Sequence, residues 1–389
     1  MTTTTNLIPA NRATHLGFSD IVKIRNRVIG MLERGQRVLR LEGGEPFMPT
    51  PPFIKDAMKE ALDADQTRYA PSSGIPQLID AIQLKLAEHN ALRVDPRSII
   101  VTSGGAHGLF CAFQTVVDPG DEVMLFSPYW TPIRDHITFA GGVPVRVPWE
   151  EVHGVDDLRE ILQQRLTART KLLYVNSPAN PTGDVLSRRQ LESVAAFAVE
   201  NNLTVISDEA YEDLVWDGEH ASLASFPDMF KRTISIYTLS KSFAMTGWRV
   251  GYVVADETWM EVIRKLVLNS INGVSTPSQF AAAAAVTHGK AFIASVRDDY
   301  RQRRDLMVRA LNEAGLRCES PRGAFYLFPD VRERLGNDSW KAMEAVLERT
   351  SIASVPGVVF GAEGEGHLRM SFSTSMETIE EAAEALHKL

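Results

Sequence analysis

The chain has 389 residues, of which 44% are hydrophobic and 23% are charged, and its formal net charge is −8. This length exceeds the roughly 250–300 residues that one hydrophobic core supports, so we expect two domains in a globular protein. The negative charge argues against nucleic acid or an anionic membrane as a partner, and no apolar run approaches the roughly 20 residues of a membrane span. Two cysteines, Cys111 and Cys318, make no disulfide framework, and residues 1–6 do not have the pattern of a signal peptide, so we expect a cytoplasmic location.

The N-terminal 44 residues indicate an arm and a helix followed by a glycine turn. Apolar residues recur at helical spacing from residue 19 to about residue 35. A short strand near 38–41 runs into Gly43-Gly44, which is either an irregular turn or a place where a ligand approaches the backbone closely. Helical patterns follow at 52–65 and 76–90, and the turn-rich linker between them contains Tyr69.

Strands and helices then alternate up to residue 270. The strand candidates are mostly short continuous apolar runs, typical of strands covered by helices on both faces. They lie at 99–102, 122–126, 144–147, 172–176, 203–207, 233–237 and 250–254, and helical patterns lie at 106–117, 155–167, 188–201 and 257–270. This alternation predicts an α/β fold with a mostly parallel seven-stranded sheet and helices on both faces.

The C-terminal part has a different pattern. Residues 275–317 are helical by spacing, and residues 318–389 mix short strands with helices at 339–349 and 376–388. Because the strand–helix alternation is absent there, we expect a second, smaller α+β domain. We assign residues 45–290 to the large domain and residues 291–389 to the small one, with residues 1–44 belonging to the small domain.

Several polar residues directly follow the predicted strands, where open α/β sheets bind their ligands. The turn Ser103-Gly104-Gly105-Ala106-His107 opens a helix, and free N–H groups at a helix N-terminus suit a phosphate. Trp130 follows the next strand and is either a core residue or a platform for a planar ring. Asn180 lies in the turn Asn-Pro-Thr-Gly and offers a ligand both a donor and an acceptor.

Asp208 and Lys241 follow two later strands. A carboxylate at the end of an apolar strand is costly to bury unless it is paired, and a protonated pyridine nitrogen would be such a partner. A buried lysine suits a Schiff base with an aldehyde cofactor. The hydroxyl groups just before Lys241, together with Arg249 after it, suit a phosphate on that cofactor.

The order and spacing of these residues resemble the fold-type I class I/II aminotransferases, which depend on pyridoxal 5'-phosphate (PLP), and most closely their prokaryotic aspartate-aminotransferase branch. The similarity runs from about Leu41 to the C-terminus, and its most specific part is Ser-Lys-Ser-Phe-Ala-Met-Thr-Gly-Trp-Arg-Val-Gly at residues 240–251. It implies that Lys241 forms a Schiff base with PLP and later moves a proton between the substrate Cα and the cofactor. It also implies a homodimer with shared active sites, and no metal.

The resemblance assigns roles to further residues of this chain. For the cofactor it implies Asp208 at the ring nitrogen, Tyr211 and Asn180 at the ring 3′-oxygen, Trp130 on the ring face, and Gly105, Ala106, Thr238 and Arg249 at the phosphate, with Tyr69 reaching in from the other subunit. For the substrate it implies Gly44 and Arg369 at the α-carboxylate, beside Trp130 and Asn180.

Some positions depart from the family pattern. Phe47-Met48 follows Gly-Glu-Pro where Asp-Phe is frequent, Glu42 replaces a small or neutral residue, and His107 stands where Gln is frequent. A carboxylate at the cavity mouth would favour a neutral or cationic substrate side chain over an acidic one, unless Glu42 points away. Arg134 or Arg322 either meets a second substrate carboxylate or lies on the solvated surface.

Three functions remain to be compared. The first is a PLP-dependent aminotransferase that moves an amino group between an L-amino acid and a 2-oxo acid. The second is a PLP-dependent enzyme of elimination, cyclisation or another specialised reaction, because one fold hosts many chemistries. The third is a ligand-sensing regulator, although the residues before Gly44 are not basic enough for a DNA-binding module. The sequence does not identify the amino donor and acceptor.

Overall fold

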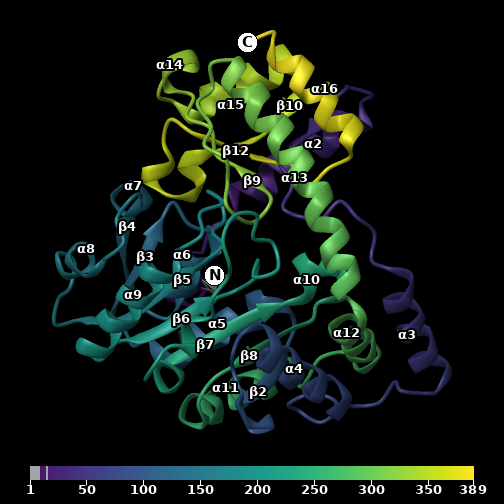
Figure 1. The fold of residues 1–389 in the computed structure, drawn as a ribbon, viewed down its shortest axis with the longest axis vertical. Coiled ribbons are helices and arrows are strands. Elements are labelled where there is room, and N and C mark those ends of the chain that lie inside the picture. The colour runs from purple at the N-terminus through teal and green to yellow at the C-terminus, as the bar shows by residue number, and fades with distance from the viewer. Residues whose placement is uncertain (1–8, 15) are drawn as a thin grey trace, which may run out of the picture.

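A computed structural model describes residues 9–14 and 16–389, so residues 1–8 and His15 of the predicted N-terminal arm lie outside the described residues. The molecule has a larger lobe built on a seven-stranded sheet and a smaller lobe built on two short sheets (Figure 1). Within the described residues, no helix is both long and apolar enough to cross a membrane.

The seven-stranded sheet forms the centre of the larger lobe. Its strands lie in the order β2 (Ile99–Thr102), β8 (Gly251–Val254), β7 (Thr233–Thr238), β6 (Thr204–Asp208), β5 (Thr170–Asn176), β3 (Glu122–Ser127) and β4 (Val143–Pro148). Only β8 runs antiparallel to its neighbours. The prediction of a mostly parallel sheet is confirmed, and each strand begins and ends within two residues of its expected bounds.

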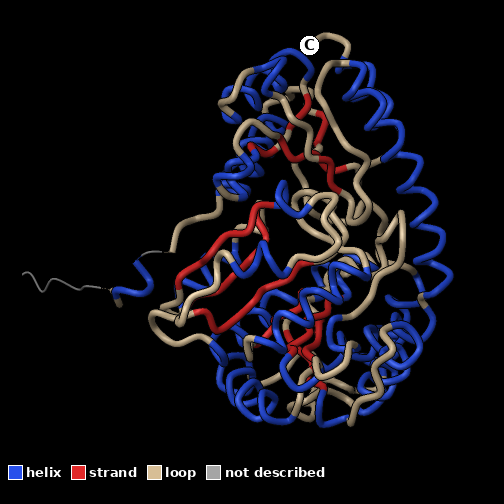
Figure 2. The backbone as a smooth tube through the Cα atoms, turned by 60° about the vertical axis from the view of Figure 1, so that its left-hand side comes forward, coloured by secondary structure: helices blue, strands red, loops and turns tan. Residues whose placement is uncertain are grey.

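Helices cover both faces of this sheet, as its apolar strands predict (Figure 2). On β2, Ile100 packs into the core under one layer of helices, whereas Ile99 and Val101 pack into the core under the other. The first layer contains α5 (Gly104–Val116), α6 (Pro132–Phe139) and α11 (Glu257–Ile271). The second contains α3 (Pro52–Asp63), α4 (Pro76–His89), α12 (Thr276–His288), α7 (Trp149–Val152), α8 (Arg159–Gln163) and α9 (Arg188–Glu200).

The smaller lobe combines short strands with helices. An antiparallel sheet contains β11 (Val355–Pro356), β12 (Leu368–Ser371) and β9 (Tyr326–Leu327), and β1 (Leu39–Arg40) pairs in parallel with β10 (Ile352–Ala353). Thus residues of the N-terminal segment pair with a strand of the C-terminal lobe. The helices are α2 (Asp20–Glu33), α13 (Lys290–Glu313), α14 (Arg332–Leu335), α15 (Ser339–Thr350) and α16 (Met376–Leu386).

Shorter elements complete the described chain. Among them is the helical turn α1 (Asn11–Thr14) near the N-terminus. The 3₁₀ turns are η1 (Pro96–Ser98), η2 (Leu223–Ser225), η3 (Phe230–Arg232), η4 (Thr246–Trp248), η5 (Gly357–Phe360) and η6 (Ala362–Gly364).

Two predicted helices differ from the structure. Of 155–167 only α8 is helical, because the Asp157 side chain accepts a hydrogen bond from Arg159 N at 3.1 Å and so competes with a helix in the preceding turn. The stretch 275–317 is divided into α12 and α13 at Gly289. A Cβ at Gly289 would lie 2.2 Å from a ring carbon of Phe243, so the close approach of this ring requires glycine there.

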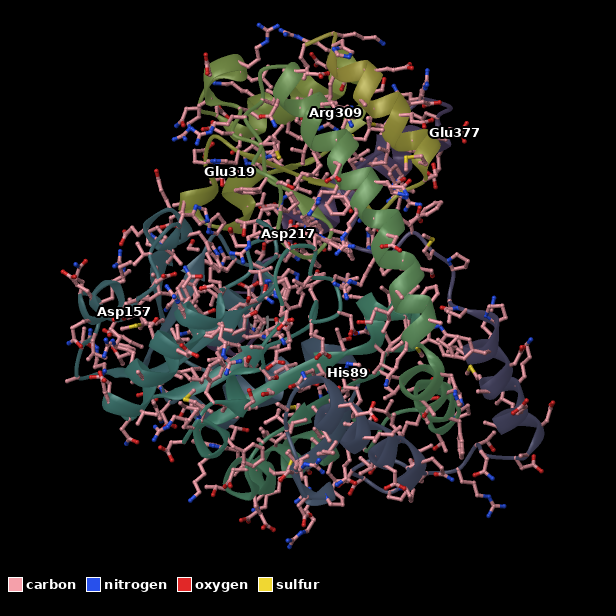
Figure 3. The ribbon with its side chains drawn as sticks, in the orientation of Figure 1. His89, Asp157, Asp217, Arg309, Glu319 and Glu377 are labelled. Atoms are coloured by element: carbon pink, nitrogen blue, oxygen red, sulfur yellow. The ribbon has the colours of Figure 1, made fainter. Side chains whose placement is uncertain are left out.

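Helix α13 runs from the larger lobe into the smaller one (Figure 1). At the junction Arg304, which is 8% exposed, pairs with Asp217 at 2.8 Å. Asp217 lies where the two lobes meet (Figure 3). The helix therefore ties the C-terminal lobe to the loop that follows β6.

Candidate active site

A cavity of about 640 Å³ lies at the carboxyl ends of β5, β6 and β7 and is closed on its other side by residues of the smaller lobe. Its position agrees with the rule that open α/β sheets bind ligands at that edge. Twelve residues have a cofactor or substrate role by the family resemblance, and the cavity brings together eleven of them: Gly44, Gly105, Ala106, Trp130, Asn180, Asp208, Tyr211, Thr238, Lys241, Arg249 and Arg369.

Lys241 lies on α10 (Leu239–Ser242), a single helical turn that begins where β7 ends. The Thr238 hydroxyl accepts a hydrogen bond from Ser240 N at 3.3 Å and caps this turn. The Lys241 ammonium donates to the Gly44 carbonyl oxygen at 2.6 Å. Burial lowers the pKa of Lys241 to about 8, because desolvation disfavours the charged amine. The amine is therefore far easier to deprotonate than an ordinary lysine.

Asp208 ends β6 and is 4% exposed. One carboxylate oxygen accepts from the Tyr174 hydroxyl at 2.7 Å, and the other accepts from Ala210 N at 3.2 Å. Burial raises the pKa of Asp208 to about 6, although the hydrogen bond from Tyr174 acts in the opposite direction. A cationic partner in the cavity would offset this cost of burial.

The N-terminus of α5 and Arg249 form a cationic end of the cavity. Gly104 has φ +76°, and a Cβ there would lie 2.5 Å from Nη2 of Arg249, so the guanidinium requires glycine at this turn. Arg249 donates to the carbonyl oxygens of Thr246 at 2.8 Å and Ser103 at 3.3 Å. Over the described part of the chain, no carboxylate pairs with Arg249. Its charge is available to a phosphate.

Aromatic and amide side chains line the middle of the cavity. Trp130 is partly buried at its wall. The Tyr211 hydroxyl lies 2.9 Å from the Tyr326 hydroxyl and 3.5 Å from Nδ2 of Asn180. Burial holds the pKa of Tyr211 well above its ordinary value, so this hydroxyl keeps its proton and can donate it to a ring oxygen.

Arg369 on β12 faces the cavity from the smaller lobe and is 2% exposed. Its Nη1 donates to Oδ1 of Asn180 at 3.2 Å, and its Nη2 donates to the carbonyl oxygen of Glu42 at 2.8 Å. Its Nε has no hydrogen-bond partner within the described chain. The guanidinium also lies 4.5 Å from the Tyr326 ring centroid. A buried guanidinium with one unpaired donor is well placed for a substrate carboxylate.

Tyr69 is the twelfth of these residues, and it does not line this cavity. It lies in the loop between α3 and α4 and is 87% exposed. Its predicted role requires a second subunit, which leaves that role a prediction.

The expectation about substrate charge assumed a free Glu42 carboxylate at the cavity mouth, and the structure shows that this carboxylate is not free. Glu42 is 1% exposed, and its carboxylate pairs with Arg40 at 2.7 Å. The extended segment 40–42 places these side chains on one face, since they are two residues apart. The negative charge is compensated inside the protein, which removes the physical basis for expecting Glu42 to repel an acidic substrate.

Of the other unusual residues, Phe47 lines the cavity, whereas His107, Arg134 and Arg322 do not. His107 accepts from Ser103 N at 3.2 Å and contacts the Ser270 hydroxyl at 2.9 Å, so it braces the start of α5. The exposed Arg134 pairs with Asp135 at 3.1 Å. Neither Arg134 nor Arg322 belongs to the described residues that line the cavity.

Sequence reasoning missed Tyr174 and Tyr326. Tyr174 lies two residues before the end of β5, and its bond to Asp208 depends on the parallel register of β5 and β6. Tyr326 lies on β9 in the smaller lobe. Its place beside Tyr211 and Arg369 requires the two lobes to meet, which a local pattern does not reveal. Ser240 also lines the cavity, and its hydroxyl beside Lys241 was the available signal.

This donor set fits PLP. The cationic end with its glycine turn suits the phosphate, Asp208 suits a protonated ring nitrogen, and Lys241 suits the aldehyde. In addition, burial makes the charged forms of Asp208 and Lys241 unfavourable, as their shifted pKa values show. Binding of PLP would remove this cost at both residues.

Comparisons with known proteins agree with this chemistry. Residues 36–386 match the family model of aminotransferase class I and II. A probable aspartate/prephenate aminotransferase of Aquifex aeolicus is 40% identical, with 97% of this chain and 98% of that protein covered. Aromatic-amino-acid aminotransferase 2 of Thermococcus litoralis is 38% identical, with 90% and 91% covered.

Solved structures agree as well. The structure of Thermus thermophilus aspartate aminotransferase with maleate superimposes with a TM-score of 0.93 at 37% identity, with 98% of this chain and 99% of that chain covered. These findings favour neither the elimination or cyclisation enzyme nor the regulator. The chain belongs to the class I and II aminotransferase family and is a PLP-dependent transaminase of fold type I, which acts on amino acids and 2-oxo acids.

Proposed function

We propose that amino-group transfer takes place in the cavity between the lobes, with Lys241, Asp208 and Arg369 in the three central roles. The observation that carries this proposal is that these three side chains come from three separate elements, α10, β6 and β12, and line one cavity. An amine with a lowered pKa, a buried carboxylate and a buried guanidinium have no common structural reason to converge there.

When bound, PLP supplies an aldehyde that combines with amines and a ring that withdraws electrons from the substrate Cα. Asp208 would accept a hydrogen bond from the protonated ring nitrogen, and Tyr174 and Ala210 hold its two oxygens in place. With a pKa of about 6 before any partner is present, Asp208 is already charged at neutral pH. Gly105, Ala106, Thr238 and Arg249 would bind the phosphate, while Trp130 would lie against the ring.

Lys241 is the residue we propose to move the proton. With PLP bound, its Nζ would take the proton from the substrate Cα and carry it towards the cofactor. A pKa of about 8 suits both directions, since a general base works best when its pKa is near the working pH. Tyr211 and Asn180 would donate to the ring 3′-oxygen, which fixes the ring relative to Nζ.

Arg369 would bind the α-carboxylate of the substrate through its unpaired Nε and the neighbouring N–H groups along the edge of its guanidinium. The contacts with Asn180 and with the Glu42 carbonyl oxygen already fix its plane, so little side-chain freedom is lost on binding. Gly44 lies beside it, and a Cβ at Gly44 would lie 3.1 Å from the Tyr326 hydroxyl, so a side chain would narrow the site.

Further proposals concern assembly and location. We propose a homodimer in which Tyr69 of each subunit contacts the partner's phosphate site, and its 87% exposure supports a role outside its own subunit. The domain bounds 1–44, 45–290 and 291–389 and the cytoplasmic location also remain proposals. They rest on the sequence, and the pairing of β1 with β10 supports the first bound.

The names of the relatives suggest aspartate, prephenate and aromatic amino acids as substrates to test. The purified holoenzyme is assayed with a panel of amino donors against 2-oxoglutarate and pyruvate. We expect turnover with at least one pair, and we expect Lys241→Ala to lose activity by about 10³-fold or more, because it removes both the attachment point and the base. Full turnover by Lys241→Ala would contradict the assignment.

A further inference from the structure

Arg40 is a second guanidinium on the smaller-lobe side of the cavity. It lies at the end of β1, lines the cavity and is 44% exposed over its side chain. Its Nε and Nη2 donate to the same oxygen of Glu42, at 2.9 and 2.7 Å. Its Nη1 makes no hydrogen bond within the described chain. One edge of the guanidinium is therefore held, and one donor group is left for a ligand.

Glu42 pairs with Arg40 and also acts on Arg369: burial lowers the pKa of Arg369, and the charge of Glu42 acts in the opposite direction. A carboxylate that is 1% exposed is costly to bury unless it is paired. Among the described residues its only ion pair is with Arg40, and its Oε2 has no hydrogen-bond partner. The position therefore carries a cost in stability that a small or neutral residue would avoid. A role in the site would account for that cost.

The same segment fixes Arg369. The Glu42 carbonyl oxygen accepts from Nη2 of Arg369, while Leu41 N donates to the Ala353 oxygen and Ser371 N donates to the Leu41 oxygen. Arg40 and Arg369 thus belong to one hydrogen-bonded unit of the smaller lobe. A substrate whose α-carboxylate binds Arg369 has a second guanidinium in the wall of the same cavity.

Building on the proposed function, we propose that Arg40 is a specificity-determining residue that binds a second carboxylate on the substrate side chain, and that Glu42 is the positioning residue that holds it. The substrate class is then a dicarboxylic amino acid or a 2-oxo diacid. Because Glu42 offsets part of the charge of Arg40, recognition rests on a directed, charge-assisted hydrogen bond more than on long-range attraction.

Arg25 on α2 is the alternative receptor. It also lines the cavity, and it is exposed. Within the described chain no hydrogen bond or ion pair fixes its guanidinium, so ordering it on a ligand would cost side-chain entropy that Arg40 has already lost. It therefore provides a matched control: an arginine in the same cavity without a positioning partner.

The test compares dicarboxylic and monocarboxylic substrates in the holoenzyme. The variants are Arg40→Gln, Arg40→Gln/Glu42→Gln and Arg25→Gln. For each, kcat and KM are measured with aspartate and 2-oxoglutarate and with alanine and 2-oxobutyrate, whose products differ from the reactants. The inhibition constants of succinate and propionate are measured against this monocarboxylic pair. We expect Arg40→Gln to raise KM for the diacids by about tenfold to a hundredfold, as loss of a charged hydrogen bond implies, with a much smaller change for the monoacids.

The remaining variants separate the possible outcomes. Arg40→Gln leaves the Glu42 carboxylate unpaired and could fold poorly for that reason. The double variant has two neutral amides instead, and it replaces the single variant in the test if that variant does not fold. We expect it to show the same loss of diacid selectivity, and we expect Arg25→Gln to stay within about threefold of the wild type. Three results would overturn the proposal. The first is an equal rise in KM for diacids and monoacids in Arg40→Gln, and the second is a loss of diacid selectivity in Arg25→Gln. The third is a wild type that binds succinate no better than propionate.

Failure of the proposed function would look different. A holoenzyme that transaminates no substrate pair would contradict the proposed function. Succinate and propionate affinities measured by the shift in thermal unfolding would still report on Arg40 in that case. Transamination with monoacids alone, with no preference for succinate, would leave the proposed function intact and contradict only the assignment of Arg40.

Discussion

Lys85 on α4 and Lys241 on α10 both place an amine inside the larger lobe. Lys241 lines the active-site cavity, whereas Lys85 lines a smaller one of about 240 Å³ whose wall includes Leu239 and Ser242 of the same α10 turn. Lys85 pairs with Glu212 at 2.5 Å, and its ammonium lies 4.6 Å from the Tyr237 ring centroid. Lys241 has a carbonyl oxygen as its hydrogen-bond acceptor.

The two amines consequently have opposite properties. Burial lowers the pKa of Lys85, but the attraction of Glu212, Tyr252 and Asp213 together with the hydrogen bond to Glu212 outweighs that effect. The net pKa therefore lies above its ordinary value. At Lys241 burial prevails and the pKa falls to about 8. Burial alone does not make a lysine reactive. A reactive amine also requires that no carboxylate pairs with it, and substitutions at these two positions should therefore change stability in opposite directions.

The largest expected effect on stability is at Lys85. Lys85→Met leaves Glu212, whose side chain is 11% exposed, without its cation. We expect the free energy of unfolding to fall by about 3 kcal/mol, because an almost buried carboxylate loses its ion-pair partner and keeps the Asn90 amide as a neutral donor. Chemical denaturation of the protein without PLP measures this change. An unchanged stability would show that Lys85 and Glu212 are not coupled as the structure indicates.

Lys241→Met is expected to stabilise the protein without PLP at pH 7 by about 2 kcal/mol. The lowered pKa implies a gain of about 3 kcal/mol, and loss of the hydrogen bond to the Gly44 carbonyl oxygen offsets about 1 kcal/mol of it. The folded-state pKa of about 8 lies below the ordinary 10.5, so the protonated amine costs stability at neutral pH, and this cost disappears between pH 8 and 10.5. The gain should therefore be greatest below pH 8 and vanish at higher pH. Denaturation curves over a pH series measure it, and a loss of stability at pH 7 would contradict the comparison.

The smallest effect is expected at an exposed ion pair that serves as a control. Arg134 pairs with Asp135 at 3.1 Å, with its side chain 52% exposed. Arg134→Ala should change the free energy of unfolding by less than about 1 kcal/mol, since solvent screens exposed pairs. It should also leave the KM values for diacids unchanged. A raised KM for diacids would instead revive the alternative that Arg134 meets a second carboxylate.

The contrast between the two lysines also shows what the sequence could predict. Lys241 was found because its neighbours, from Thr238 to Gly251, are close in the chain and form one recognisable motif. Lys85 gave no signal, since its partner Glu212 lies 127 positions away and meets it only after α4 packs against the sheet. The strands were located within two residues because both their faces are buried, which leaves continuous apolar runs.

Arg40 and Glu42 mark an intermediate case. The strand near 38–41 was expected, and residues two apart on a strand share a face, so their ion pair was within reach of the sequence. The hydrogen bond from Arg369 to the Glu42 carbonyl oxygen was not predictable from the sequence, because it spans 327 positions and depends on how β1 and β12 come together. The motif residues alone therefore define the cofactor site better than the substrate site.

The most direct test of the account is to locate the lysine that holds PLP. The holoenzyme is treated with sodium borohydride, which fixes the cofactor to its lysine, and the modified peptide is identified by digestion and mass spectrometry. We predict a single pyridoxyl group on Lys241, with Lys85 unmodified. A pyridoxyl group on Lys85, or on any other lysine in place of Lys241, would contradict the claim that an amine without a carboxylate partner defines the active site.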